Sequence, residues 1–228
     1  MQGKVKLSRR EIKEDKFATF MLTSRQRAEA NWQYIVIGVV AAAILIAGLI
    51  FYMNSRSNAS QEASTKLSQA VIDYQSGNRQ IAVLSLTQIT DQYPDHPAAE
   101  QATYLLATIN FESRVYPEAT RFFEQYLSKY KNNKLNRAAA LAGLAAIMEN
   151  QGQVAEAGAK YLEAVKEYPD GPLEPDYYLS AVRTFLEAGN TTNAQMAIDS
   201  LESKYPSAPA LVKAVRMFAE KGAAKSGS

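Results

Sequence analysis

One pattern of residues recurs four times along this chain in a fixed register, at intervals of 37, 38 and 37 residues. Its anchor is an alanine, present as Ala82, Ala119, Ala157 and Ala194. Mostly apolar residues follow four and seven positions later, and a tyrosine follows at the eleventh: Tyr93, Tyr130, Tyr168 and Tyr205. Spacings of four, seven and eleven place side chains on one face of an α-helix. Each anchor therefore predicts a helix that buries this face.

The residues around each predicted helix indicate where helices end. Five positions before the anchor the chain has Gly77, Gly152 and Gly189, with Arg114 in the second unit. A glycine there supplies the left-handed residue that ends a preceding helix. A proline follows the tyrosine in three of the four units, and the residue before a proline avoids the α region. Each unit is therefore predicted to be a helix hairpin, and a period of this length is typical of an α-solenoid.

The predicted fold is all-α, with about four helix hairpins and a C-terminal capping helix from Pro209 to about Lys221. The order of small residue, glycine, alanine and proline in each unit resembles the tetratricopeptide repeat family from about Ser60 to Pro206. The tryptophan usual in the first helix of that family is replaced by Lys66, Thr103, Leu141 and Tyr178. The resemblance implies that the first helices of the hairpins line a concave groove.

A long apolar segment precedes the repeats. No residue from Ala30 to Ser55 is charged, and the 19 residues from Ile35 to Met53 are almost wholly apolar. As a helix they rise about 28 Å, close to the roughly 30 Å of a hydrocarbon core. A buried solenoid helix would show a polar stripe, and a cleaved signal peptide would have a shorter apolar core without a long charged segment before it. We therefore expect one uncleaved transmembrane helix.

Charge predicts the orientation of this helix. Residues 1–29 hold eight lysines and arginines against four acidic residues, a net charge of +4. The positive-inside rule places the N-terminus in the cytoplasm and the repeats across the membrane, which is the periplasm in a Gram-negative-type cell. The predicted organisation is a basic cytoplasmic tail (1–32), a transmembrane signal-anchor helix (33–53), a polar linker (54–59), the solenoid (60–221) and a disordered tail (222–228).

The cytoplasmic tail has a helix signal of its own. Ser8 followed three residues later by Glu11 is a capping-box pattern, which predicts a short helix from about Arg9. Ile12, Phe17, Phe20 and Met21 give this helix a partial apolar face. It would lie on an anionic membrane surface, dock on a partner, or remain a modestly structured tail.

The residue content gives no support for catalysis, a cofactor or a metal. The chain has no cysteine and one histidine, His96, which is expected to be a loop residue before the next helix. Glu163 and Glu167 form an i,i+4 pair, but they are predicted to lie on a solvated helix face. The formal net charge of only +2 gives no indication of nucleic-acid binding. The sequence has no phosphate-binding loop motif, so nothing in it indicates a small-molecule substrate. The partners predicted are other proteins.

The tetratricopeptide resemblance implies a set of groove residues, obtained by carrying the groove positions of the family over in register. The polar and aromatic candidates for partner binding are Tyr74, Tyr104, Thr108, Phe111, Glu112, Glu149, Asn150 and Arg183. The other positions are Leu67, Val71, Ala142, Ala146, Leu179 and Leu186. Half of these positions could equally be packing between neighbouring units. Relatives that clamp an acidic tail use lysines and asparagines, whereas this groove has one arginine and predicts apolar or aromatic peptide segments as partners.

The layout as a whole resembles a narrower family. A short basic tail (Lys6–Phe17), one signal-anchor helix and a tetratricopeptide solenoid are similar to the ancillary subunit of the bacterial Sec translocon. That resemblance implies an inner-membrane protein whose solenoid contacts periplasmic chaperones near the translocon. Two functions stay open: an adaptor for chaperones or their clients, and a constitutive scaffold subunit of a larger inner-membrane or envelope complex.

Overall fold

The computed structural model describes residues 32–226, and over this range the protein is helical with no strand. The short helix predicted near Arg9 lies outside the described residues. The helices are α2 (Trp32–Gln75), α3 (Arg79–Gln92), α4 (Pro97–Glu112), α5 (Tyr116–Lys129), α6 (Lys134–Asn150), α7 (Val154–Glu167), α8 (Glu174–Glu187), α9 (Thr191–Lys204) and α10 (Pro209–Ser226). The chain divides into two units, residues 1–58 and 59–228, and each is described by itself.

In the first unit, the described residues belong to the N-terminal part of α2. It is the one helix in the range 32–226 that is long and apolar enough to cross a membrane. Apolar side chains on all its sides are exposed, including Ile44, Leu49 and Phe51. The segment 54–59, expected as a linker, is helical instead. It contains neither glycine nor proline, so nothing in it interrupts the backbone hydrogen bonds.

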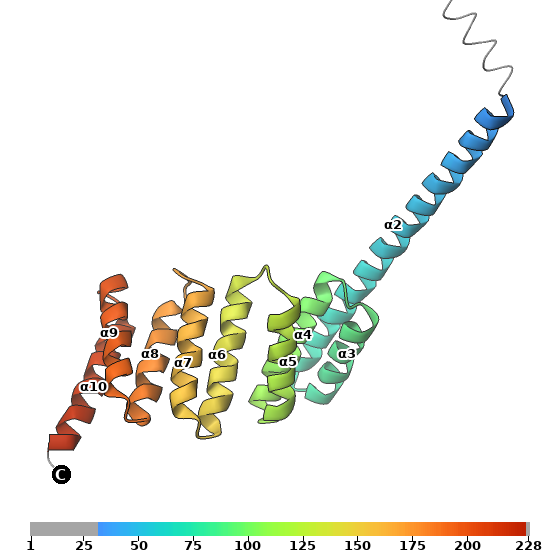
Figure 1. Cartoon of the computed structure of the whole chain (residues 1–228). Coiled ribbons are helices and arrows are strands. Elements are labelled where there is room, and N and C mark those ends of the chain that lie inside the picture. The colour runs from blue at the N-terminus through green and yellow to red at the C-terminus, as the bar shows by residue number, and fades with distance from the viewer. Residues whose placement is uncertain (1–31, 227–228) are drawn as a thin grey trace, which may run out of the picture. The chain divides into compact units, whose positions relative to one another are not determined.

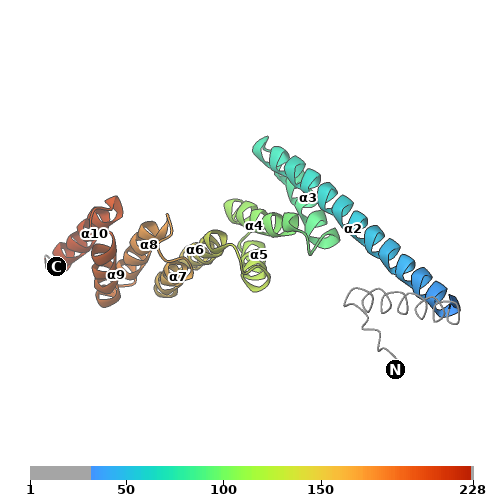
Figure 2. The ribbon, with the colours of Figure 1, turned by 90° about the horizontal axis from the view of Figure 1, so that it is seen from above.

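The second unit is the predicted α-solenoid. The C-terminal part of α2 with α3, then α4 with α5, α6 with α7, and α8 with α9 form four hairpins, and α10 follows them. The helices from α3 to α10 stand one after another in a row (Figure 1). Seen from above, α4, α6, α8 and α10 lie in one layer and α5, α7 and α9 in the other (Figure 2). The predicted all-α fold class is confirmed.

The turns inside the hairpins show why glycine recurs before the anchors. Gly77, Gly152 and Gly189 have φ values of +84°, +79° and +74°, and Arg114 adopts the same left-handed conformation at +59°. The same backbone hydrogen bond follows in all four turns, at 2.8–2.9 Å: Asn78 to Asp73, Val115 to Asn110, Gln153 to Met148 and Asn190 to Phe185. This bond, from an N–H to the carbonyl five residues earlier, satisfies a helix-terminal acceptor as in a Schellman motif.

The tyrosine column ends the second helices as predicted. Tyr93, Tyr130, Tyr168 and Tyr205 are the C-cap residues of α3, α5, α7 and α9. The last helix differs from the prediction, because α10 continues through Gly222 to Ser226 rather than ending near Lys221. Residues 222–226, expected to be disordered, are therefore helical. Alanine and lysine are strong helix formers, and a single glycine opposes them by only about 1 kcal/mol.

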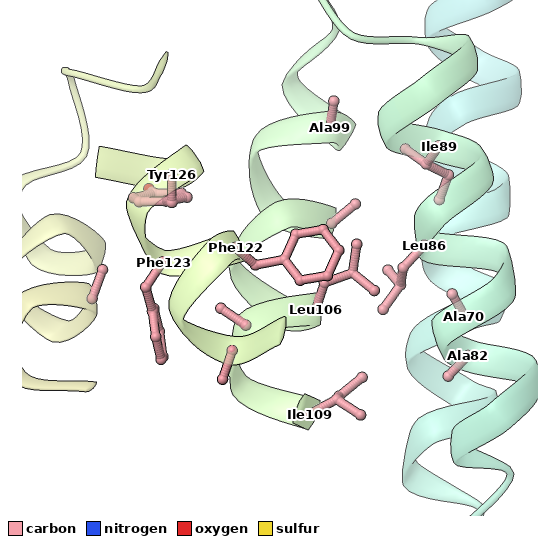
Figure 3. Packing of buried hydrophobic residues seen from close by; sticks show 14 of the residues in the cluster. Ala70, Ala82, Leu86, Ile89, Ala99, Leu106, Ile109, Phe122, Phe123 and Tyr126 are labelled. Atoms are coloured by element: carbon pink, nitrogen blue, oxygen red, sulfur yellow. The ribbon is translucent and has the colours of Figure 1, made fainter. Parts of the chain in front are cut away.

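The core runs between the two layers. All four anchor alanines have no exposed surface, which confirms their assignment to the buried face. In the first two hairpins Leu86 and Ile89 of α3 lie close to Leu106 of α4 and Phe122 of α5, as Figure 3 shows. Gly143 allows α6 to approach α5, because a Cβ at this position would come within 2.5 Å of the Phe123 ring. Small residues at crossings thus set the spacing of neighbouring hairpins.

Candidate binding surface on the first helices

The groove residues predicted from the sequence all come from the first helices of the hairpins. We call this set the first-helix surface. Its polar and aromatic members are Tyr74 on α2, Tyr104, Thr108, Phe111 and Glu112 on α4, Glu149 and Asn150 on α6, and Arg183 on α8. Two of the apolar positions, Leu67 and Leu186, are buried in the core and are therefore packing residues.

At the N-terminal end of the solenoid, Tyr74 and Glu112 join two neighbouring hairpins. The Tyr74 hydroxyl donates a hydrogen bond of 2.5 Å to Glu112 Oε2. Arg79 Nη2 lies 3.5 Å from the same oxygen. The hydrogen bond to the carboxylate, ahead of burial, raises the pKa of Tyr74. Glu112 is thus already occupied by partners from the first hairpin.

A second pair, Glu149 and Arg183, joins the third and fourth hairpins in the same manner. The guanidinium faces the carboxylate with two nitrogens, and Arg183 Nη2 lies 2.9 Å from Glu149 Oε2. The Tyr161 hydroxyl lies 3.4 Å from Glu149 Oε2. Burial, followed by the Glu149 charge, raises the pKa of Tyr161 to about 12. A bidentate arginine–carboxylate pair has both directional strength and fixed geometry, so these two charges satisfy one another.

The two aromatic candidates on α4 pack against their own hairpin. The Tyr104 ring makes edge contacts with Phe123 and Tyr126, with ring centroids 6.4 and 5.5 Å apart. Burial raises the pKa of Tyr104. The Phe111 ring lies 6.1 Å from the Tyr116 ring. Both rings are half-buried, so each combines a packing contact with a remaining exposed edge.

The small polar candidates bond to their own helices. Thr108 Oγ1 donates to the Tyr104 carbonyl at 3.1 Å, and Asn150 Nδ2 donates to the Ala146 carbonyl at 2.8 Å. The neutral residues Ala142, Ala146 and Leu179 are only partly covered. The first-helix surface therefore presents half-buried rings, small apolar groups and charges that are already paired. Such a surface suits uncharged, apolar segments of another protein.

The structure brings together no group of three or more histidine, aspartate or glutamate side chains that could hold a metal ion between residues 32 and 226. His96, expected in a loop, is the N-cap residue of α4 and lies edge-on to the Tyr93 ring, with ring centroids 6.0 Å apart. The contacts of His96 are those of a structural residue.

Sequence reasoning missed polar contacts between the two helices of each hairpin. Glu174 on α8 is 1% exposed and accepts hydrogen bonds from Lys204 and Tyr205 of α9. Arg137 on α6 pairs with Glu167 on α7. Glu167 was expected on a solvated face, but its side chain is 26% exposed, because Arg137 reaches it from the neighbouring helix. Opposite charges at fixed distances from the anchors could have indicated these pairs.

A cavity of about 410 Å³ was also missed, between α7, α8 and α9. Tyr178 and Phe185 of α8, Leu162 of α7 and Met196 of α9 line it, together with polar side chains. Tyr178 occupies the position of the tryptophan that is usual in the family. This replacement is the feature of the sequence that could have drawn attention to the cavity. None of the eight polar and aromatic candidates lines this cavity.

Comparison with known proteins accounts for the fold. No curated protein matches the chain significantly. Among solved structures, a single-substitution variant of nearly identical TPR-like repeats, from a protein described as a kinesin light chain of Podosopora anserina, matches 74% of this chain and 88% of its own length. The TM-score is 0.55 at 19% sequence identity, so the likeness shows the fold alone. Residues 28–169, more than half of the chain, match the tetratricopeptide repeat-like domain. The chain therefore belongs to the tetratricopeptide repeat-like domain family.

Proposed function

We propose that this protein is a non-enzymatic, membrane-anchored interaction module, acting as a periplasmic adaptor for chaperones or their clients near the protein translocon. The tetratricopeptide-like fold supports the general function, since solenoids of stacked helix pairs provide extended binding surfaces. The proposed location in the periplasm near the translocon is supported by the order of basic tail, apolar helix and solenoid in the sequence.

One observation carries the choice of ligand class: the charges of the first-helix surface are paired within the protein. Glu112 bonds Tyr74, and Glu149 bonds Arg183. A charged peptide would have to displace these partners, and leaving the largely covered Glu149 carboxylate unpaired is costly. An uncharged apolar or aromatic segment can pack on the half-buried rings and alanines without breaking any of these contacts. This is the chemistry of an unfolded or extended client segment and of an amphipathic partner helix.

Membrane anchoring rests on the exposed apolar part of α2. Isoleucine, leucine and valine side chains are exposed on every side of this part of the helix. Such exposure is unfavourable in water and favourable in a bilayer. The +4 charge of residues 1–29 supports an N-terminus in the cytoplasm and a solenoid in the periplasm of the inner membrane.

Photocrosslinking in cells tests the proposal. A photoreactive phenylalanine analogue is placed at Thr108 or Ala146 on the first-helix surface, and at Glu124 or Glu202, exposed positions of α5 and α9, as matched controls. We expect the first two positions to give discrete adducts with periplasmic chaperones, their clients or translocon subunits, and the controls to give none of these. Adducts of equal yield from both helix layers, or none from the first, would contradict the proposed surface.

A constitutive scaffold subunit is the second candidate, and one feature of α2 favours it. Gly38 and Gly48 lie in its exposed apolar part, and a Cβ at either position would meet no atom within 4 Å. Small residues let transmembrane helices approach one another closely. Co-purification in mild detergent separates the two functions. A scaffold keeps a fixed stoichiometric partner that is lost with Gly48→Leu, whereas an adaptor gives partners in variable, substoichiometric yield.

A further inference from the structure

The last helix, α10, continues the repeat in register. Twelve residues before each anchor, the first helices carry Ala70, Ala107, Ala145 and Val182, all with no exposed surface. The next member at the same interval is Ala219 on α10, 37 residues after Val182, and it is exposed. α10 lies in the same layer as α4, α6 and α8 (Figure 2). It is therefore equivalent to the first helix of a fifth hairpin.

The face that contains Ala219 is the one that second helices cover in the preceding hairpins. In the first two hairpins, the residues equivalent to the position four before Ala219 are Lys66 and Thr103. Lys66 bonds Tyr93 of α3, and Thr103 lies 3.5 Å from the Tyr130 hydroxyl of α5. In the second hairpin, the residue equivalent to the position seven before Ala219 is Glu100, which accepts a hydrogen bond of 2.7 Å from Tyr126 of α5. These positions in α10 are Val215 and Val212, with 48% and 72% of their surface exposed.

Nothing within residues 32–226 covers this face. α10 packs against α8 and α9 through Ala210, Leu211 and Ala214. On its uncovered side, Val212, Val215 and Ala219 have the i, i+3, i+7 spacing of one helix face. The register therefore specifies what would cover it: a helix that packs on α10 as α5 packs on α4.

Charge decides which kind of helix fits. Between residues 209 and 226, α10 has four positive residues and one acidic residue, a net charge of +3. It is the most basic of the helices α3–α10. Lys213 and Arg216 are exposed beside the apolar stripe, and Glu220, 3.8 Å from Arg216, is the one acid there. Two copies of α10 would bring +3 against +3, which disfavours self-association. The second helices α7 and α9 each carry a net charge of −1.

We propose that α10 docks an acidic amphipathic helix of a partner protein, with small residues on its apolar face, in the place of a fifth second helix. The apolar stripe Val212, Val215 and Ala219 uses none of the register positions of the first-helix surface, and it would act as a second point of attachment. The helix would pack on Val212, Val215 and Ala219 and place its carboxylates near Lys213 and Arg216.

The test uses the full-length protein in nanodiscs and two labelled peptides based on residues 154–168. In the acidic peptide Lys160→Glu and Lys166→Glu remove the positive charges, and in the basic peptide Glu156→Lys, Glu163→Lys and Glu167→Lys reverse the others. We expect saturable binding of the acidic peptide, with Val215→Glu and Ala219→Glu in the protein each weakening it at least about tenfold. Ile81→Glu, at an exposed apolar position on α3, is the matched control and should leave binding unchanged.

Circular dichroism checks that each protein variant keeps its helix content, which the exposure of these positions predicts. Equal affinity for the acidic and basic peptides, no saturable binding, or insensitivity to both α10 variants would overturn the proposal. So would sedimentation showing a dimer that Ala219→Glu converts to a monomer, because a second copy would then be the occupant.

Discussion

Lys204 Nζ on α9 lies 2.7 Å from Glu174 Oε1 on α8, and the third hairpin has the same pair with the charges reversed. Glu174 stands 20 residues before its anchor and Lys204 stands ten after it. Arg137 and Glu167 occupy those two positions in the third hairpin and also form an ion pair. The repeat therefore conserves the contact between the two helices of a hairpin while exchanging its sign.

Glu174→Ala is expected to lower the free energy of unfolding by about 2 kcal/mol, because it removes the acceptor shared by Lys204, Tyr205 and the Asp170 backbone N–H. Glu174→Arg combined with Lys204→Glu reproduces the arrangement of the third hairpin and should recover part of the loss caused by Glu174→Arg alone. Urea denaturation measures the cycle. Glu220→Ala, which breaks an exposed pair, is the control and should change stability by less than about 0.5 kcal/mol. Additive single effects would mean that the charges are not coupled.

Arg114→Gly is expected to stabilise the solenoid by roughly 0.5–1 kcal/mol, because Arg114 holds a φ of +59° that glycine adopts without strain. Gly152→Val, at the same turn position of the next hairpin, should destabilise it, since a β-branched residue tolerates this conformation poorly. No atom lies within 4 Å of a Cβ at Gly152, so the backbone alone causes the loss. Thermal melts measure both, and a lower melting temperature for Arg114→Gly would contradict this view of the turn.

Ala119→Leu and Ala157→Leu should each cost about 1–3 kcal/mol, because both anchors are fully buried where two helices cross. Ala155→Leu, two residues before Ala157 on the exposed side of α7, is the matched control. If all three variants melt alike, the anchors are not crossing points.

Tyr161 and Tyr177 are among the tyrosines that should titrate late. Burial raises the pKa of both Tyr161 and Tyr177 to about 12. Since the folded pKa is above the ordinary value of 10, the folded state holds these protons more tightly than the unfolded state. Their contribution to stability is complete below about pH 10 and is lost as the pH rises through about 12. Tyrosinate absorbance should show this late class, and Tyr161→Phe and Tyr177→Phe should each remove one group from it. Titration of every tyrosine near pH 10 would count against this burial.

The fold could be predicted from the sequence because its determinants are local and repeated. An anchor alanine, a turn glycine and a terminal tyrosine each act within one hairpin, and the period then fixes the stacking. The segment expected as a polar linker (54–59) and residues 222–226, expected as disordered, both belong to helices, because polar or small composition does not by itself interrupt a helix. The segment 54–59 contains no glycine or proline, and the single Gly222 opposes the helix in 222–226 by only about 1 kcal/mol.

The candidate site was less accessible to the sequence. Register located Glu149 and Arg183 on first helices, but their bidentate pairing depends on the distance between α6 and α8. Likewise, nothing in the spacing shows that Tyr104 packs edge-on against Phe123 and Tyr126. A side chain at a given register position faces either the surface open to a partner protein or the neighbouring hairpin. Its rotamer and the crossing of the helices decide between these two orientations.

We propose above that α2 anchors the solenoid in a membrane with its N-terminus in the cytoplasm. Protease added to intact spheroplasts measures this most directly, with an epitope tag fused before Met1. We expect the repeats from Ser60 onward to be degraded, the tag to remain protected, and alkaline carbonate to leave the protein in the membrane fraction. Protection of the repeats, or release of the intact protein by carbonate, would contradict it.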